Sequence, residues 1–590
     1  MARPTNKDLL VRYREKLEQS RKWRKQEKCD ETWKRMIDMY RGRHYDMSSN
    51  EDRTLVNMAF STINVIAPSV SINHPKITVS AQKPEDADRA TVTEAIVNYW
   101  WRHYGCQKQF RKAVKDQLIV GHGWIKTGYR FVEEERVKNP VATEESTDVL
   151  DVTQAESTVE TELVVLEDRP FVERISPFDI FVDPNATDMF DIKWIAQRIK
   201  RPLADVRNDR RYNSTARSEV NATMYSKYSI EEKSARQSMS KDNSYVEVWE
   251  WYDISKGLMS VFADGSDKFL ITPTEIPFAF GHPFVMLRNY DIPEHFYPMG
   301  ELEAIEALQH ELNETRTQMM NHRKRFSRKW LYKESAFDPD GRAALESDED
   351  NVMVPVVGDE PLGGVITPMP AVINPPEFYN QSSLIAGDMD RVSGVSDYMR
   401  GSMPEIRRTA TEAAIAQDAS NARAAEKLAT IELDIGQCAN RLVQLAQQYM
   451  TGEQVVRVVG SNSIPLWVQF DRDYISGDFD FEVEAGSTQP VNESFRRQMA
   501  LQMVDAMAPF AQAGVVDMAA LARHVLQFGF GVKSPEAYLT SPQQQMQQGQ
   551  PGQQPMPPQE LPQGAPQGAP QLPPELMAQL AAGGGAPPMG

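Results

Sequence analysis

Few segments of the sequence combine the residue types and spacing that catalysis or metal binding requires. The Gly-His-Gly run at 121–123 lacks the further glycine and the Lys-Ser/Thr pair that cradle a nucleotide phosphate. The Asp-Pro-Asp-Gly run at 338–341 begins like a calcium loop, but its later ligand positions hold unsuitable residues. No nucleophile elbow is present, and the nine histidines are scattered. We therefore expect no enzyme, no cofactor and no metal; an active site assembled from distant residues is the alternative.

Charge limits the possible functions further. The net charge of -18 argues against a protein that coats nucleic acid, which normally has a basic balance. Cys29, Cys106 and Cys438 lie far apart, which suits a reducing compartment and excludes a disulfide framework. The chain has no apolar run long enough to span a bilayer and no secretory signal at its start, so we expect no membrane anchor.

Two basic segments stand out on this acidic chain. Residues 1–45 hold fourteen Lys/Arg and seven Asp/Glu, which fits either a contact to nucleic acid or an acidic partner, or an amphipathic helix lying on its own protein. A second cluster has no acidic residue within it and fits either a solvated helix end or a surface that faces phosphates. Its members are Arg316, Arg323, Lys324, Arg325, Arg328 and Lys329.

The N-terminal half alternates predicted helices and strands, and at 590 residues the chain is long enough for two to four domains. Residues 133–168 form an acidic insertion with twelve Asp/Glu against Arg136 and Lys138, typical of a solvated hairpin or a partly disordered segment. The expected helices of this half are 55–72, 87–104 and 107–120, and the expected strands are 76–80, 124–132, 245–253 and 257–271.

The C-terminal half is dominated by long helices, predicted at 300–329, 376–395 and 409–450. The last has an apolar stripe in its second half and alanines in its first, which favours packing against copies of itself. That stripe is Leu428, Ile431, Ile435, Ala439, Leu442, Ala446 and Tyr449. We expect a turn-rich region at 330–370 with a strand at 352–357, a small sheet from 455–459, 466–470 and 479–483, helices at 493–507 and 518–528, and a disordered Gln/Pro-rich tail at 541–590.

Three motifs in this order resemble the portal protein, or head-to-tail connector, of tailed double-stranded DNA bacteriophages, over about residues 1–530. The first is ISPFDIFVDP at 175–184 with Trp194 after it. The second is Gly-Glu-Leu at 300–302, followed by Gln309, Glu311, Leu312 and Asn313. The third is Gly401 followed by Thr-Ala-Thr-Glu-Ala at 409–413.

The resemblance implies a mainly helical α+β portal-type fold, assembled as a ring. The implied domains are an N-terminal wing at 1–299, stem helices at 300–329 and 376–395, and a clip at 330–370. They continue with a tunnel loop at 396–408, a long wing helix and small sheet at 409–490, and a crown at 491–530.

By resemblance, the chain is not an enzyme but a homo-oligomer, a dodecamer, at one capsid vertex of the virion, assembled in the host cytoplasm. Double-stranded DNA is packaged and later ejected through its channel without sequence preference. The implied protein partners are the terminase large subunit, the major capsid and scaffold proteins, and head–tail adaptor or tail proteins. A head–tail adaptor or an internal head protein is the alternative.

The charges suggest how such a channel would treat DNA. A tight phosphate-binding wall would stall movement, because each neutralised phosphate adds affinity. We therefore expect a mostly negative wall with sparse basic rings. The candidates are Arg400, Arg407 and Arg408 in the tunnel loop and the cluster from Arg316 to Lys329 on the stem. Salt bridges between subunits are the alternative role for the loop arginines.

Overall fold

The computed structural model divides the chain into two compact units, Met1–Val491 and Asn492–Gly590, which we describe separately. The residues that it describes are 5–44, 53–70, 75–137, 161–223, 244–326, 330–347, 353–358, 361–368, 376–395, 410–451, 454–459, 465–483, 493–512, 518–530, 532 and 538.

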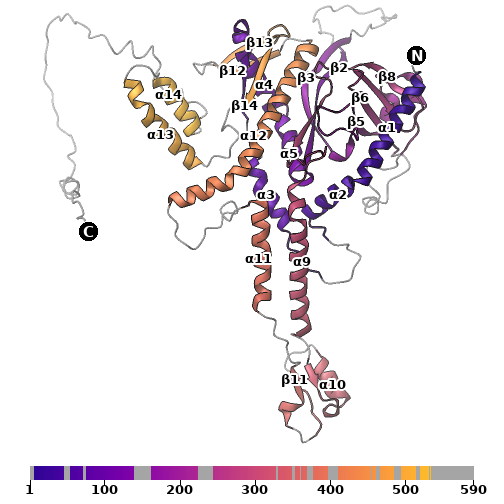
Figure 1. The fold of residues 1–590 in the computed structure, drawn as a ribbon, viewed down its shortest axis with the longest axis vertical. Helices are drawn as coiled ribbons and strands as arrows, with labels where there is room; N and C mark the ends of the chain where they lie inside the picture. Colours follow the sequence, from indigo (N-terminus) through magenta and orange to yellow (C-terminus); the bar gives the residue numbers. More distant parts are fainter. Residues whose placement is uncertain are drawn as a thin grey trace, which may run out of the picture. The chain divides into compact units, whose positions relative to one another are not determined.

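The first unit mixes helices and strands (Figure 1). Its helices are α1 (Asn6–Gln26), α2 (Cys29–Tyr40), α3 (Met58–Val70), α4 (Ala87–His103), α5 (Cys106–Val120), α6 (Leu203–Asn208), α7 (Ser214–Ser218), α9 (Glu301–Phe326), α10 (Pro339–Glu346), α11 (Pro376–Ser393) and α12 (Ala410–Tyr449). Its strands are β1 (Ile77–Ala81), β2 (His122–Val137), β3 (Thr161–Ile175), β4 (Ile180–Val182), β5 (Trp194–Pro202), β6 (Tyr245–Asp253), β7 (Leu258–Ala263), β8 (Phe269–Glu275), β9 (Phe284–Arg288), β10 (Trp330–Tyr332), β11 (Ile366–Pro368), β12 (Gln454–Val459), β13 (Pro465–Phe470) and β14 (Phe479–Val483).

Two antiparallel sheets form the centre of this unit. One has the strand order β3-β2-β9, and the other has the order β4-β5-β6-β7-β8. Among the described strands no sheet closes into a barrel. The predicted strands 124–132 and 245–253 correspond to β2 and β6, and β2 runs five residues further than predicted. The predicted strand 257–271 is in fact two strands, β7 and β8, separated by a turn at 264–268, and β9 was not predicted.

The glycines at 121 and 123 turn α5 into β2, as the sequence predicted. Gly121 ends α5 with a φ of 100°, which favours glycine, and its N–H donates to the carbonyl of Gln117. A Cβ on Gly123 would lie 2.1 Å from the carbonyl oxygen of Ala113, so helix and strand pack backbone to backbone. The run therefore serves packing.

His122, between these glycines, is an uncharged member of the core. Its ring lies 4.6 Å from that of Trp33 and 4.9 Å from that of Tyr297, measured between centroids. Among the described residues neither ring nitrogen has a hydrogen-bond partner. Burial lowers the pKa of this fully buried imidazole to about 3, so it is neutral at physiological pH.

The basic N-terminal segment lies on its own protein through α1. Tyr13 on α1 stacks on Trp251 of the five-stranded sheet, with ring centroids 4.7 Å apart. The basic side chains also pair internally: Arg14 with Asp267 at 3.2 Å, and Arg24 with Asp30. This confirms the amphipathic-helix interpretation of α1.

Helix α12 crosses the core with the predicted apolar stripe. Ile431, Ile435 and Leu442 are fully buried, whereas Tyr449 is half-buried. A Cβ on Gly436 would lie 2.8 Å from the carbonyl oxygen of Phe481, so this glycine lets β14 approach the helix. The alanine side chains of 410–422 lie outside the described residues, and their packing against other copies stays a prediction.

One prediction for the region between α9 and α11 was wrong. Residues 353–358 form no strand; the two short strands are β10 and β11, which pair with each other. The Asp-Pro-Asp-Gly run, which the sequence predicted to be unsuitable as a calcium loop, is the start of α10, where the Asp338 carboxylate accepts the N–H of Gly341 at 2.7 Å. The carboxylate caps a helix because the following residues favour helix.

The predicted small sheet after α12 is also divided. β12 pairs with β13, but β14 pairs with β1, near the start of the chain. The three strands are close in sequence, which suggested one sheet, whereas the contact of β14 with α12 brings β14 to a distant strand.

The second unit contains α13 (Glu493–Gln512), α14 (Met518–His524) and a π-helical turn at Val525–Gly529. These agree with the helices predicted at 493–507 and 518–528.

Gly300, immediately before α9, provides a test of this packing. A Cβ there would lie 2.7 Å from the carbonyl oxygen of Ile119, so Gly300→Ala should lower the free energy of unfolding by about 1–3 kcal/mol. The matched control is Gly387→Ala within α11, where a Cβ would meet nothing within 4 Å and should stabilise the helix by up to about 1 kcal/mol. Urea unfolding measures both; equal effects would contradict the close backbone contact.

Candidate functional site: the anchorage of helix α9

Helix α9 carries a row of polar side chains on one buried face. Gln309, Asn313 and Thr317 follow one another at four-residue spacing, which places them on the same side of a helix. Gln309 and Asn313 are fully buried and Thr317 is 7% exposed. A buried polar group needs a hydrogen-bond partner, so this row must meet one.

The partner is the backbone of residues 54–59, which comprise the segment that leads into α3 and the first two residues of that helix. Gln309 accepts the N–H of Ala59 at 3.0 Å and donates to the carbonyl of Val56 at 2.8 Å. Asn313 accepts the N–H of Val56 at 3.2 Å. Thr317 accepts the N–H of Thr54 at 3.1 Å in the same way. The row thus holds both the segment before α3 and the first turn of that helix through their backbone groups.

The first turn of α9 is fixed to α12 by a buried ion pair. Glu301 and Lys427 are in direct contact, and their side chains are 2% and 9% exposed. The Lys427 ammonium also donates to the Tyr290 hydroxyl at 3.1 Å, and that hydroxyl donates to Glu301 at 3.3 Å. Burial lowers the pKa of Lys427 to about 7, while the adjacent carboxylate favours its charged form.

A cavity of about 620 Å³ opens beside this ion pair. Arg288, Asp291 and Val392 line it together with the ion pair. Arg288 is held by Asp291 at 2.5 Å and by Asp188 at 3.5 Å. The cavity therefore has charged walls whose charges are largely matched within the protein.

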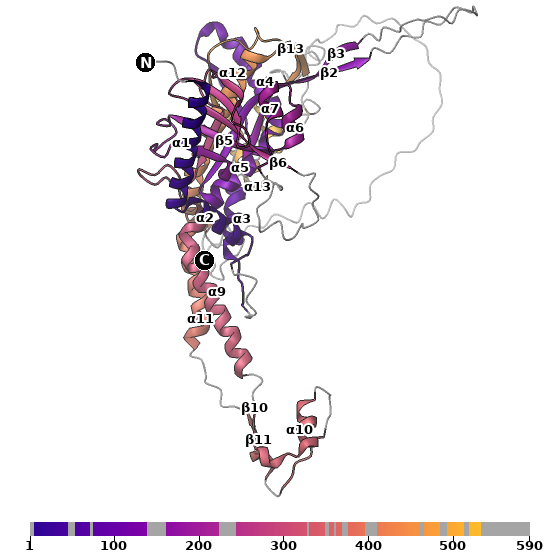
Figure 2. The same cartoon turned by 90° about the vertical axis from the view of Figure 1, so that its right-hand side faces the viewer.

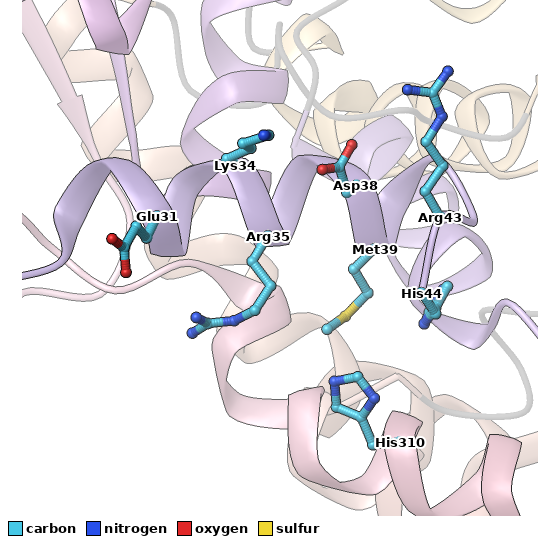
Figure 3. A pocket seen from close by; sticks show the side chains of 8 residues that line it. All are labelled: Glu31, Lys34, Arg35, Asp38, Met39, Arg43, His44 and His310. Atoms are coloured by element: carbon cyan, nitrogen blue, oxygen red, sulfur yellow. The ribbon is translucent and has the colours of Figure 1, made fainter. Parts of the chain in front are cut away.

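A second hollow lies where α2 meets α9 (Figure 3). Arg35 reaches from α2 to Glu306 on α9, with a nitrogen–oxygen distance of 3.3 Å. His44 and His310 lie with ring centroids 6.4 Å apart. Burial, and secondly the nearby His310, lowers the pKa of His44. Within the described ranges no three His, Cys, Asp or Glu side chains are placed to hold a metal ion. The residues that line this hollow thus link α2 to α9 through the pair of Arg35 and Glu306.

Comparison with known proteins identifies the family. The model of the family described as phage SU10 portal protein matches residues 10–581. The chain belongs to this portal protein family. A solved structure titled "Neck of empty GTA particle computed with C6 symmetry" matches at 12% identity, covers 83% of this chain and 93% of that chain, and has a TM-score of 0.36, too low to carry an argument. No curated protein matches the chain.

The structure describes the side chains of three of the six basic residues predicted as a cluster on α9. Arg316, Arg323 and Lys324 are exposed on α9. Arg316 and Arg323 are seven residues apart, which puts them on one face about 10.5 Å apart along the axis. The side chain of Arg325 lies outside the described residues, as do Arg328 and Lys329 entirely.

The other predicted site lies wholly outside the described residues. Arg400, Arg407 and Arg408 belong to the segment between α11 and α12, of which nothing is described. Their role as channel-facing residues therefore stays a prediction. Among the described residues, no helix is sufficiently long and apolar to cross a membrane.

Sequence reasoning missed the residues that anchor α9. Gln309 and Asn313 were noticed as family marks without a role, although polar residues at four-residue spacing predict a hydrogen-bonding row. Lys427 precedes the apolar stripe and shares its face with Ile431, which is a signal for a buried cation. Its partner Glu301, 126 positions earlier in the chain, had no such signal.

Breaking the buried ion pair should be costly. Lys427→Met leaves the Glu301 carboxylate buried without a cation, and we expect a loss of about 3–5 kcal/mol in unfolding free energy. Adding Glu301→Gln should restore part of that loss, because the uncompensated charge is removed.

The matched control for this pair is Lys268→Met, which breaks the pair with Glu219, both side chains 50% exposed, and should cost under about 1 kcal/mol. Denaturant unfolding of the four variants and the parent gives the coupling energy. Strict additivity of Lys427→Met and Glu301→Gln would contradict a direct interaction.

Proposed function

We propose that this chain forms the ring-shaped portal at one vertex of a phage capsid, through which double-stranded DNA is packaged and later ejected. The family match over residues 10–581 is the observation that carries the proposal. Portal proteins are structural, and no step of this function requires the chain itself to be an enzyme. The terminase supplies the energy for DNA movement.

The arrangement of α9 and α11 supports a channel-forming role. The two helices lie side by side in both views (Figures 1 and 2), and they pack on each other. Between them the chain forms a small region built around Phe337 and Val365, with its own hairpin of β10 and β11. We assign 300–329 and 376–395 to the two stem helices and 330–370 to the clip.

The clip is a fitting surface for the terminase. Met353 is 93% exposed, and Leu331 and Val357 are each 54% exposed. Exposed apolar side chains gathered in a small region indicate a site for another protein. The other proposed partners are the capsid and scaffold proteins and the head–tail adaptor or tail proteins. The remaining proposed domains are the wing at 1–299, the long helix and small sheet at 409–490, and the crown at 491–530.

The acidic net charge favours a channel through which DNA passes rather than one that binds DNA tightly. A ring of chains with a net charge of -18 each repels the DNA backbone on average. Sparse cations then hold the duplex loosely. On α9 the pair Arg316 and Arg323 is suited to that role, and in the tunnel loop the candidates are Arg400, Arg407 and Arg408.

Electron microscopy of the purified full chain tests the ring. We expect class averages of a closed ring, a dodecamer, with a central hole wide enough for duplex DNA. A head–tail adaptor would also form a ring, so the ring must in addition be incorporated into procapsids when scaffold and capsid proteins are present. Filaments, or closed shells without a channel, would overturn the proposal.

Charge reversal tests the tunnel loop. Arg407→Glu with Arg408→Glu should leave the ring assembled but impair DNA packaging or retention, because each lost cation removes a phosphate contact. Arg407→Lys with Arg408→Lys is the matched control and should retain function. Nuclease-protected DNA per particle gives the readout. Loss of the ring itself would assign these arginines to salt bridges between subunits, and no change in assembly, packaging, retention or ejection would exclude both roles.

A further inference from the structure

The loop between β4 and β5 holds a phenylalanine side chain out in solvent. Phe190 is 97% exposed, the highest value among the large apolar side chains that the structure describes. A partly exposed apolar side chain is ordinary at a protein surface, whereas nearly complete exposure of an aromatic ring is not.

This loop is anchored on both sides of the phenylalanine. Ala186 before it and Ile192 after it are each 5% exposed. Between them the Asp188 carboxylate pairs with Arg288 at 3.5 Å and the Asp188 carbonyl accepts the N–H of Asp191 at 3.2 Å. A side chain presented on an anchored loop needs little further ordering to bind, and aromatic side chains are enriched at the centres of interfaces. The loop therefore indicates a contact with another surface.

The hollow between α2 and α9, which we call the α2–α9 hollow, can receive such a side chain (Figure 3). Its volume is about 310 Å³, and a cavity of about 150 Å³ already admits benzene. Met39, His44 and His310 line it, and Figure 3 shows the Met39 side chain extending toward His310. A thioether and two imidazoles pack favourably against a phenyl ring.

The phenylalanine loop and the α2–α9 hollow lie on different sides of α9. Arg288, which pairs with the loop, lines the cavity of about 620 Å³ next to Glu301. His310 of the hollow follows Glu301 by nine residues, about two and a half turns, so the two side chains leave the helix in opposite directions. A closed ring is built from heterologous contacts, in which one patch of each subunit meets a different patch of the next. The loop and the hollow meet that requirement.

Two other hollows suit the phenylalanine less well. The cavity beside Glu301 and Lys427 opens on the same side of α9 as the loop itself. A depression on α1 is lined by residues of that helix alone, and Val11 is the only apolar one among them. Neither combines an apolar base with a position across α9 from the loop.

One pair of charges is also complementary. Asp191 follows the phenylalanine directly and is exposed, and Arg43 is exposed where it lines the α2–α9 hollow. Within the part of the chain that the structure describes, neither side chain takes part in an ion pair. Both charges are therefore available for a contact between subunits.

We propose that Phe190 of one subunit inserts into the α2–α9 hollow of the neighbouring copy, an inference that rests on the proposed ring. The phenyl ring packs on Met39 and on the two imidazoles, and the Asp191 carboxylate meets the Arg43 guanidinium. Burial of the ring supplies most of the contact, and the ion pair orients it.

An exchange of side-chain sizes tests this contact in the full chain. Phe190→Ala removes the aromatic anchor and His310→Trp fills its seat, so each alone should weaken ring assembly by about tenfold or more. The two together place an indole where the phenyl ring was and should restore assembly to within about threefold of the parent. Both positions are exposed, which lets the fold tolerate the changes.

Tyr474→Ala is the matched control, because it removes another exposed aromatic side chain, and it should leave assembly unchanged. Mass photometry over a range of chain concentrations measures the ring fraction. Two results would overturn the contact: Phe190→Ala could assemble like the parent, or the double variant could assemble no better than the weaker single one. Normal rings of Phe190→Ala that fail to bind an adaptor or capsid protein would assign the phenylalanine to that partner instead.

Cross-linking separates this contact from the ring itself while the phenylalanine is kept. In a chain with Cys29→Ser, Asp191→Cys with Arg43→Cys should be joined between chains by a short bismaleimide, whereas Asp191→Cys with Lys22→Cys on α1 should not. The other two native cysteines are buried. Rings without this cross-link would overturn the docking and leave the portal function intact. Cross-linked chains that never close into rings would retain the docking and overturn the portal function.

Discussion

The fold depends on one long helix whose buried polar side chains need hydrogen-bond or ion-pair partners. Helix α9 enters the protein with a carboxylate, an amide pair and a hydroxyl on its buried side, and each must find a partner because burying it alone is costly. Lys427 of α12 and the backbone at 54–59 supply those partners, and Arg35 of α2 adds a pair with the partly exposed Glu306. Three segments far apart in the sequence are thereby fixed on one helix, which joins the mixed core to the helical pair of α9 and α11.

The distribution of charge follows a related rule. Cations near the core are paired or lie over aromatic rings, as Arg24 lies 4.7 Å above Trp33 and 4.4 Å above Phe181. Among the described residues, exposed cations gather in groups of one sign on α5 and on the outer part of α9. On an acidic chain such groups stand out against their surroundings. The proposed channel, which must let a polyanion move, has reason to keep its cations few and local.

Local pattern predicted the elements well, and it failed where a partner came from elsewhere in the chain. The long helices and the stripe through Ile431 and Leu442 follow from periodicity alone, because apolar residues at helical spacing mark the face of a helix that is buried. The pairing of β14 with β1 and the contact of Glu301 with Lys427 depend on distant segments, and no local signal identifies them. The predicted site was placed only in part: Arg316 and Arg323 lie on one exposed face, and their facing DNA depends on an assembly that a single chain does not specify.

His122 has a consequence for how the protein responds to acid. Its pKa is about 3 in the folded chain and about 6.5 once the imidazole reaches water, so unfolding takes up a proton between those values. Stability supplied by the neutral ring is complete above pH 6.5 and is lost as the pH falls toward 3. His282, with a pKa also near 3 because of burial, acts in the same direction. Two imidazoles in the interior thus make proton uptake a driving force for unfolding, and the proposed ring would multiply that uptake by its number of subunits.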